Sequence, residues 1–372
     1  MRIGMIGTGW VSPQHLDAIA LVTGAEVVAV SGRELGKAEA LATPRKAAAY
    51  ADWRTMVARE RLDAVYICVP PGAAAEIAIG CAGTVRGVMV EKPVCVDIGA
   101  GERVVAAFRA AGTIGAAAYH NRTRAMAARI AGLCAESRPV AVDAWWHGDM
   151  PGVAWWRNRA MSGGQMHEQA THLVDLLRRW LGEAVEVSAI ASRGRQVNIE
   201  GSTIDDAMIA TIRFAAGTIA TVHTSCIAAP GQDLDNIGLN LRGHGWMARL
   251  SGWGMDCRIA HGGKIEELPA EKQPFLLQAQ AFVRAVTAGD AGLLPCRFED
   301  GLATARLTEA MGRAAGLLHE RLRRIGMRNV QTLNAGGHSC VYAEHLEAPE
   351  SRASPQGCAV AGASEGPSRD RA

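Results

Sequence analysis

The pattern of apolar positions changes about one third of the way along the chain. Up to residue 119, short and almost continuously apolar runs alternate with Ala-rich amphipathic segments. Runs that are apolar throughout are typical of parallel strands covered on both faces, and the segments between them are typical of crossover helices. The first part of the chain is therefore predicted to be an α/β domain with a doubly wound parallel sheet. Its expected strands occupy residues 3–6, 27–30, 64–67, 88–90 and 114–118, and its expected helices include 33–41, 73–82 and 97–111.

The second part of the chain has strands that alternate apolar and polar positions, with few helical segments between them. Gly217 between two such runs predicts a hairpin turn. This pattern indicates an α+β domain with a large, mostly antiparallel sheet, covered on one face by a helix over 165–181. The expected strands are 140–147, 185–190, 207–214, 218–225 and 236–242, and two further helices are expected at 275–288 and 300–324.

The length of 372 residues favours two domains, because a single hydrophobic core stops growing beyond about 250 to 300 residues. We place a dinucleotide-binding domain at 1–120 and a substrate and oligomerisation domain at 121–325. Residues 326–372 are rich in Gly, Ser, Pro and Ala without periodicity, so a disordered tail is expected there.

Charge and cysteine content narrow the class of partner. A formal net charge of +2, spread along the sequence, gives no reason to expect nucleic acid or an anionic membrane surface, so small molecules are the expected partners. Nine cysteines without regular spacing indicate free or buried thiols in a reducing compartment. No apolar stretch reaches a membrane span, and the first strand leaves no room for a signal peptide, so we expect a cytoplasmic protein. A homodimer or homotetramer through the open face of the second sheet is also expected.

A glycine-rich turn follows the first predicted strand. Gly7 permits the sharp turn and Gly9 permits close approach of a pyrophosphate, which the positive end of the following helix attracts. Ser12 replaces the usual third glycine, and we expect it to cap that helix. This context favours a Rossmann nucleotide site over a plain turn. Its expected cofactor-binding residues are Gly7, Thr8, Gly9, Trp10, Val11 and Ser12.

The end of the second strand bears on the choice of dinucleotide. An acidic residue there usually binds the ribose of NAD, but the sequence has Ser31-Gly32-Arg33. Ser31 and Arg33 are suited to a 2′-phosphate, which favours NADP over NAD. The alternative is that Arg33 begins a solvated helix and NAD binds without its usual acid.

Four motifs together resemble the glucose-fructose oxidoreductase, inositol dehydrogenase and MocA family, over about residues 1–324. They are Glu91-Lys92-Pro93, Tyr119-His120-Asn121-Arg122, Ser162-Gly163-Gly164, and Glu168 followed by His172 and Asp175. The chain departs from the family pattern at Ser12, at Ala73-Ala74-Ala75 after Pro70-Pro71, at Ser162, and at Glu168, where an aspartate is usual.

The resemblance implies a two-domain NAD(P)-dependent oxidoreductase that transfers a hydride at a secondary alcohol or ketone of a sugar, inositol or related cyclic polyol. It makes Lys92 the catalytic lysine, His172 the catalytic histidine, and Glu168 the counterpart of the active-site aspartate. Pro70, Glu91 and Lys92 complete the expected cofactor contacts. Asn121, Arg122, Trp156 and His172 are the expected substrate contacts, and no metal site is expected.

The residue types suit the oxidation of an alcohol. Histidine titrates near neutrality and can accept the hydroxyl proton, while a lysine ammonium stabilises developing charge on oxygen. Glu168 precedes His172 by one helical turn, so it is expected to orient the imidazole or to pair with Lys92, whereas His167 points elsewhere. The alternative is that Glu168, His172, Asp175 and Arg179 form a solvated polar stripe of an ordinary amphipathic helix.

Two other functions remain open from the sequence. Related folds that retain the dinucleotide cleave glycosidic bonds through transient oxidation, and others are non-catalytic sensors of nucleotide or sugar. The presence of both Lys92 and His172 argues against a sensor, which needs no proton-transfer pair.

Overall fold

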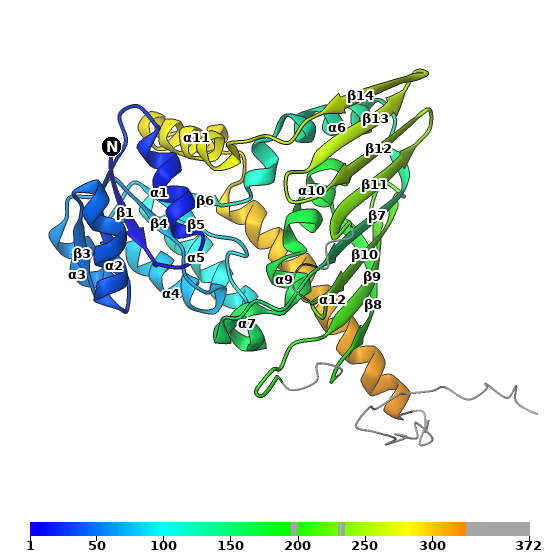
Figure 1. The fold of residues 1–372 in the computed structure, drawn as a ribbon, viewed down its shortest axis with the longest axis horizontal. Coiled ribbons are helices and arrows are strands. Elements are labelled where there is room, and N and C mark those ends of the chain that lie inside the picture. The colour runs from blue at the N-terminus through cyan, green and yellow to red at the C-terminus, as the bar shows by residue number, and fades with distance from the viewer. Residues whose placement is uncertain (195–198, 230, 232–234, 325–372) are drawn as a thin grey trace, which may run out of the picture. The chain divides into compact units, whose positions relative to one another are not determined.

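The computed structural model describes residues 1–194, 199–229, 231 and 235–324. The expected tail at 326–372 lies outside the described residues. The two sheets and the helices that connect them form one compact unit, and Figure 1 shows their order along the chain.

The first sheet has six parallel strands in the order β3-β2-β1-β4-β5-β6. The five predicted runs are confirmed as strands, and β3 is an additional strand of three residues, too short to give an apolar pattern. The strands are β1 (Arg2–Ile6), β2 (Glu26–Ser31), β3 (Ala48–Tyr50), β4 (Ala64–Ile67), β5 (Gly87–Val90) and β6 (Ile114–Ala117); the helices between them are α1 (Ser12–Ala20), α2 (Leu35–Ala42), the 3-10 helix η1 (Thr43–Arg45), α3 (Trp53–Arg59), α4 (Pro71–Cys81) and α5 (Ile98–Ala111).

The second sheet has eight strands in the order β14-β13-β12-β11-β7-β10-β9-β8. Every pairing is antiparallel except the parallel pair of β10 with β7. The predicted mostly antiparallel sheet is confirmed, as is the hairpin at Gly217, whose N–H donates to the carbonyl of Phe214. The strands are β7 (Pro139–His147), β8 (Ala184–Ser192), β9 (Ala207–Phe214), β10 (Ile219–Ser225), β11 (Ile237–Gly243), β12 (Trp246–Ser251), β13 (Asp256–His261) and β14 (Lys264–Leu268).

Three strands of this sheet, β12 to β14, were missed by the pattern analysis. Met247 is exposed on β12 and Ile265 is exposed on β14, so apolar residues stand on both faces and blur the alternation. These segments form strands because they pair with neighbouring strands, and that pairing depends on the tertiary structure.

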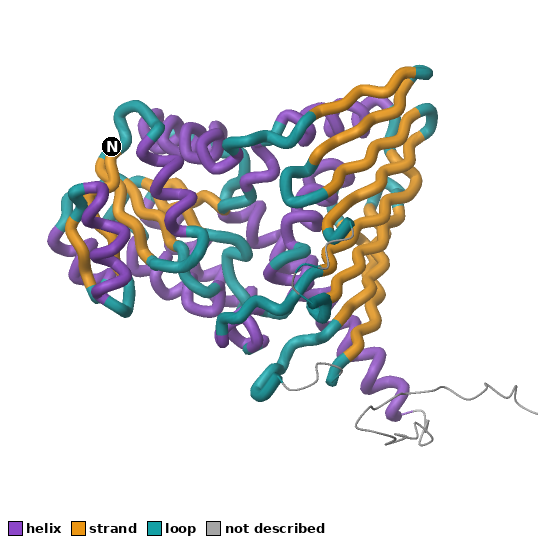
Figure 2. Tube along the Cα trace, viewed as in Figure 1, coloured by secondary structure: helices purple, strands orange, loops and turns teal. Residues whose placement is uncertain are grey.

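The helices of the second part lie on one face of the eight-stranded sheet (Figure 2). The predicted single helix over 165–181 is wrong in one respect, because it is two helices separated at Gln169 and Ala170. The elements are the 3-10 helix η2 (His120–Thr123), α6 (Ala125–Glu136), α7 (Ala154–Arg157), α8 (Arg159–Ser162), α9 (Gln165–Glu168), α10 (Thr171–Leu181), α11 (Pro274–Ala288), the 3-10 helix η3 (Ala291–Leu293) and α12 (Phe298–Arg324).

Helix α10 is enclosed rather than solvated. All of its residues except Arg179 are buried, including His172 and Asp175. The alternative of a solvated polar stripe is therefore wrong, because these polar groups face packed elements and not water.

Helix α12 packs in the cores of both sheets, and α11 packs in the core of the first. Phe282 and Val286 of α11 lie in the core of the first sheet, as do Phe298 and Leu302 at the start of α12, whereas Met311 of α12 lies in the core of the second sheet. The division at residue 120 separates the two sheets, but the chain returns to the first core after residue 274. Within the described part of the chain, no helix is both long and apolar enough to span a membrane.

Candidate active site

The turn after β1 has the geometry of a phosphate-binding loop. Gly7 has φ +114°, and a Cβ there would lie 2.0 Å from the carbonyl oxygen of Cys68, so only glycine fits. A Cβ at Gly9 would meet no atom within 4 Å, which leaves open space against the backbone. The expectation that Ser12 caps the helix is wrong. Val11 occupies the N-cap position, and the Ser12 hydroxyl donates to the carbonyl of Gly7 at 3.1 Å.

The start of α1 fits a dinucleotide pyrophosphate. No side chain caps this helix, and no acceptor among the described residues takes a hydrogen bond from the amide N–H groups of residues 8–11. Unsatisfied amides at the positive end of a helix are the groups that bind phosphate oxygens. Pro70 precedes α4 at the same carboxyl edge of the sheet.

The end of β2 lies next to this turn. A Cβ at Gly32 would lie 2.5 Å from the Thr8 side chain, so the two segments are in contact. Ser31 is 1% exposed, whereas Arg33 is exposed and has no hydrogen-bond or ion-pair partner among the described residues. Of the two expected phosphate ligands, only the Arg33 guanidinium is open to a ligand.

Glu91 fixes the end of β5 against the nucleotide helix. One carboxylate oxygen lies 2.6 Å from Nε2 of His15 on α1, and the other accepts the Lys92 backbone N–H at 2.9 Å. The side chains of His15 and Glu91 are 1% and 9% exposed. His15 was missed by sequence reasoning, because a histidine in a helix gives no signal of its partner. The contact sets the position of Lys92 relative to the turn.

Lys92 and Glu168 meet across the two domains. The Lys92 ammonium donates to Oε1 of Glu168 at 2.6 Å and to its main-chain carbonyl at 2.8 Å. The indole N–H of Trp156 donates to Oε2 at 2.8 Å. Of the two expected roles for Glu168, the structure therefore shows the pairing with Lys92. Trp156 is 1% exposed, and it contacts Glu168 instead of presenting a ring face for substrate.

His172 lies in an aromatic cage. The ring is stacked at 5.9 Å on Trp146, and His120, Tyr119 and Trp253 surround it. It is 2% exposed, and neither ring nitrogen has a partner among the described residues. Burial is the main reason that the pKa of His172 is well below its usual value, and the charge of Lys92 lowers the pKa further. The neutral imidazole has two free nitrogens, one of which can accept a hydrogen bond from a bound hydroxyl, while burial and the Lys92 charge both oppose its protonation.

Arg124 and Trp253 complete this cage, and both were missed. The Arg124 guanidinium donates to the carbonyl of Gly254 at 2.7 Å and to the side chain of Asn121 at 2.7 Å. It thereby fixes the turn after β12, which brings Trp253 over His172 and against Trp10 of the nucleotide turn. The local sequence signal for Trp253 is its position between Gly252 and Gly254, which marks an aromatic residue in a turn. Asn121 is 3% exposed and is occupied by Arg124.

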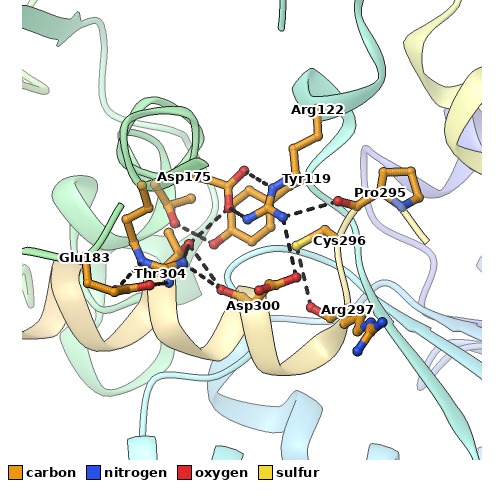
Figure 3. Close-up of polar contacts among 11 residues, drawn as sticks. Tyr119, Arg122, Asp175, Glu183, Pro295, Cys296, Arg297, Asp300 and Thr304 are labelled. Carbon is orange, nitrogen blue, oxygen red and sulfur yellow. Dashed lines mark hydrogen bonds and ion pairs between the residues drawn. The ribbon is translucent and has the colours of Figure 1, made fainter. Parts of the chain in front are cut away.

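Arg122 occupies a different place from the other expected site residues. Its guanidinium forms two hydrogen bonds to Asp175, at 2.8 and 2.7 Å, and a third to the carbonyl of Pro295 (Figure 3). Both side chains of the ion pair are buried, at 6% and 1% exposed. The pair fixes α10, and hence His172, against η2 at the domain boundary.

The glycine run and His167 position Glu168. Gly163 and Gly164 have φ +78° and +86°, and a Cβ at Gly163 would lie 2.4 Å from the His167 ring. His167 contacts Thr308 and the carbonyl of Cys95, each at 2.7 Å, so it points away from the site as expected. In the described part of the chain, no three histidine, cysteine or carboxylate side chains are arranged to hold a metal ion.

Because His120 and His172 are buried, we expect the protein to lose stability in acid. Burial, followed by the charge of Arg124, lowers the pKa of His120 to about 3, and the pKa of His172 is lowered as well. Both therefore stay neutral in the folded protein while the unfolded chain takes up protons below about pH 6.5. The stability that comes from keeping the two histidines neutral is complete above that pH. By pH 5 the free energy of unfolding should fall by about 2 kcal/mol for each histidine.

Urea unfolding of the native protein and of His120→Gln between pH 7.5 and 5 checks this expectation. The variant should lose less stability over this range, with the exposed His261→Gln as the matched control. Equal slopes for the native protein and His120→Gln would contradict the assignment.

The arrangement defines a dinucleotide-dependent oxidoreductase, and the comparisons with known proteins agree. Residues 1–119 match the family described as "Oxidoreductase family, NAD-binding Rossmann fold". Residues 137–245 match the family described as "GFO/IDH/MocA C-terminal domain". The chain belongs to the GFO/IDH/MocA family of oxidoreductases. The resemblance inferred from the motifs is confirmed.

Individual relatives are similar over part or most of the chain. An inositol 2-dehydrogenase of Rubrobacter xylanophilus is 22% identical over 83% of this chain and 89% of its own length. A scyllo-inositol 2-dehydrogenase (NADP⁺) of Bacillus subtilis is 30% identical over 31% of this chain and 35% of its own length. The solved structure of levoglucosan dehydrogenase with NADH and L-sorbose has a TM-score of 0.75 at 20% identity, covering 85% of this chain and 97% of that one.

Proposed function

We propose that this oxidoreductase transfers a hydride between a nicotinamide dinucleotide and a secondary alcohol or ketone of a sugar, inositol or related cyclic polyol. The observation that carries the proposal is the Lys92–Glu168 pair beside the neutral, unpartnered His172, at the carboxyl edge of the sheet that begins with the phosphate-binding turn. Ligands in open α/β sheets bind at that edge.

Each residue has a distinct role in the proposal. His172 accepts the hydroxyl proton when the alcohol is oxidised and returns it in the reverse direction. Lys92 stabilises negative charge on the same oxygen, which is effective because its side chain is only 14% exposed. Glu168, fixed by Trp156, orients the ammonium. A dinucleotide bound at residues 7–12 supplies the hydride chemistry.

The surroundings of His172 suit a ring-shaped substrate. Trp253, which is 45% exposed, presents an aromatic surface next to the imidazole, and such surfaces pack against the C–H faces of saturated rings. The named activities of the relatives, inositol dehydrogenation among them, agree with this class.

The proposal is tested by the change in nicotinamide absorbance when the purified protein is given NADP⁺ or NAD⁺ with a panel of inositols and aldoses. Turnover that requires both Lys92 and His172 supports it. The hydrolase alternative would be favoured by two results together. No compound of the panel is turned over, and a glycoside is hydrolysed while the dinucleotide stays bound and unchanged.

We further propose that NADP(H) binds more tightly than NAD(H), because Arg33 is exposed, unpartnered and close to the turn. Arg33→Ala should weaken NADP binding by about 1.5 to 3 kcal/mol and leave NAD binding nearly unchanged, since only the 2′-phosphate needs the guanidinium. Titration by nicotinamide fluorescence measures both affinities. Equal losses for the two dinucleotides would exclude a phosphate-specific role.

Self-association through the open face of the second sheet is also proposed. Exposed apolar residues gather on its strands, on the face opposite the covering helices, where they would otherwise stay in contact with water. They include Val140 on β7, Ile209 on β9 and Ile219 on β10. Analytical ultracentrifugation of the native protein and of Ile209→Lys tests whether this face joins two copies.

A further inference from the structure

A cavity lies at the domain boundary, and its lining includes neither Lys92, Glu168 nor His172. It has a volume of about 650 Å³, and five arginines line it together with the carboxylates Glu183, Glu299 and Asp300. The arginines come from α5, η2, α10 and the segment before α12, and they are Arg109, Arg122, Arg178, Arg179 and Arg297.

The inner wall of this cavity, which we call the arginine pocket, has two arginines that pair with three carboxylates, Asp175, Glu183 and Asp300. Arg122 is fixed by Asp175, and its Nη1 lies 3.6 Å from Asp300 (Figure 3). Arg178 pairs with Glu183 and donates to the Thr304 hydroxyl at 2.9 Å. Both guanidinium groups belong to side chains that are 6% exposed, so they form a fixed floor.

The rim of the arginine pocket carries an excess of positive charge. Arg109, Arg179 and Arg297 are exposed, and none of them has a carboxylate partner among the described residues. Glu299 is the one lining carboxylate without an ion-pair partner in the described part of the chain. The guanidinium groups of Arg109 and Arg179 have no hydrogen-bond partner among the described residues, and that of Arg297 donates only to the carbonyl of Ala291, at 3.3 Å. Such groups favour a ligand with several negative charges, because each can form paired hydrogen bonds to a phosphate or carboxylate.

We propose that the arginine pocket binds a small multivalent anion that carries phosphate or carboxylate groups, separately from the dinucleotide. The volume lies within the range of small-molecule sites, about 300 to 1,000 Å³. Arg109 belongs to the first domain and Arg179 to α10 of the second, so a bound anion bridges the two domains and stabilises their arrangement. The inference does not depend on the proposed catalytic function, because it concerns binding alone.

Isothermal titration with pyrophosphate and with citrate tests the proposal, at constant ionic strength and with a saturating dinucleotide so that the turn at residues 7–12 is filled. Saturable binding of either anion is expected, with a higher melting temperature in its presence. Arg179→Gln combined with Arg297→Gln should weaken that binding at least tenfold. Tighter binding of pyrophosphate identifies a phosphate ligand, and tighter binding of citrate identifies a polycarboxylate.

The control is Arg284→Gln, which removes an exposed arginine on α11, outside the pocket. It should bind the anions as the native protein does. Because Arg179 and Arg297 are exposed, the double variant should fold normally, and its melting temperature without ligand checks this. Absence of saturable binding to the native protein, or equal weakening in the control, would overturn the proposal.

Discussion

Lys92→Met should reduce kcat by about 100-fold or more while changing dinucleotide affinity little. The ammonium is positioned by two contacts with Glu168 in a partly enclosed site, and groups aimed at developing charge in such sites are typically worth this much. Methionine keeps the length of the side chain and removes its charge. Steady-state kinetics, combined with fluorescence titration of the dinucleotide, separates loss of chemistry from loss of binding.

Two further variants make this test specific. Lys37→Met replaces an exposed lysine that pairs with Glu34, and it should leave kcat unchanged. His172→Asn should also reduce turnover, because no neutral imidazole remains to take the proton. Since Lys92 and His172 are proposed to act on one oxygen, the loss in the double variant should be smaller than the product of the two single losses. Near-normal turnover in both single variants on a true substrate would refute the mechanism.

The sequence was sufficient for the elements with a strong local pattern. The apolar runs of the first sheet need no partner to be recognised, since burial on both faces leaves each run uninterrupted. The same is true of the turn at Gly7, where the backbone requirement is local. Lys92 and His172 were found by resemblance to a family, because a lysine after a strand and a histidine in a helix have no local mark of catalysis.

What the sequence did not give was the pairing of side chains from distant segments. Helical spacing left two partners open for Glu168, the His172 imidazole and the Lys92 ammonium, and did not decide between them. The chain breaks at Gln169 and Ala170, and Glu168 pairs with Lys92, 76 residues away. His15 and Arg124 were missed for the same reason, since their partners, Glu91 and the turn after β12, are brought near only by folding.

Asp175→Asn should destabilise the protein by about 3 kcal/mol or more, the second large effect we expect. The substitution keeps the shape of the side chain but removes the buried counter-charge of the Arg122 guanidinium, which is 6% exposed. Only the exposed Asp300, 3.6 Å away, then remains as a carboxylate partner, and a poorly paired buried charge is costly. Urea unfolding measures the free energy. Asp143→Asn, which breaks the half-exposed pair with Arg242, is the matched control and should cost no more than about 1 kcal/mol.

The double variant Asp175→Leu with Arg122→Met separates the charge effect from packing. Because it removes both charges and fills the space with apolar atoms, it should recover most of the stability lost in Asp175→Asn. Its activity should nevertheless stay reduced if the ion pair is what fixes α10 and the His172 ring against η2. Recovery of stability together with full activity would show that packing alone positions His172. A loss no larger than that of Asp143→Asn would instead mean that Arg122 finds water or another acceptor when Asp175 is neutral.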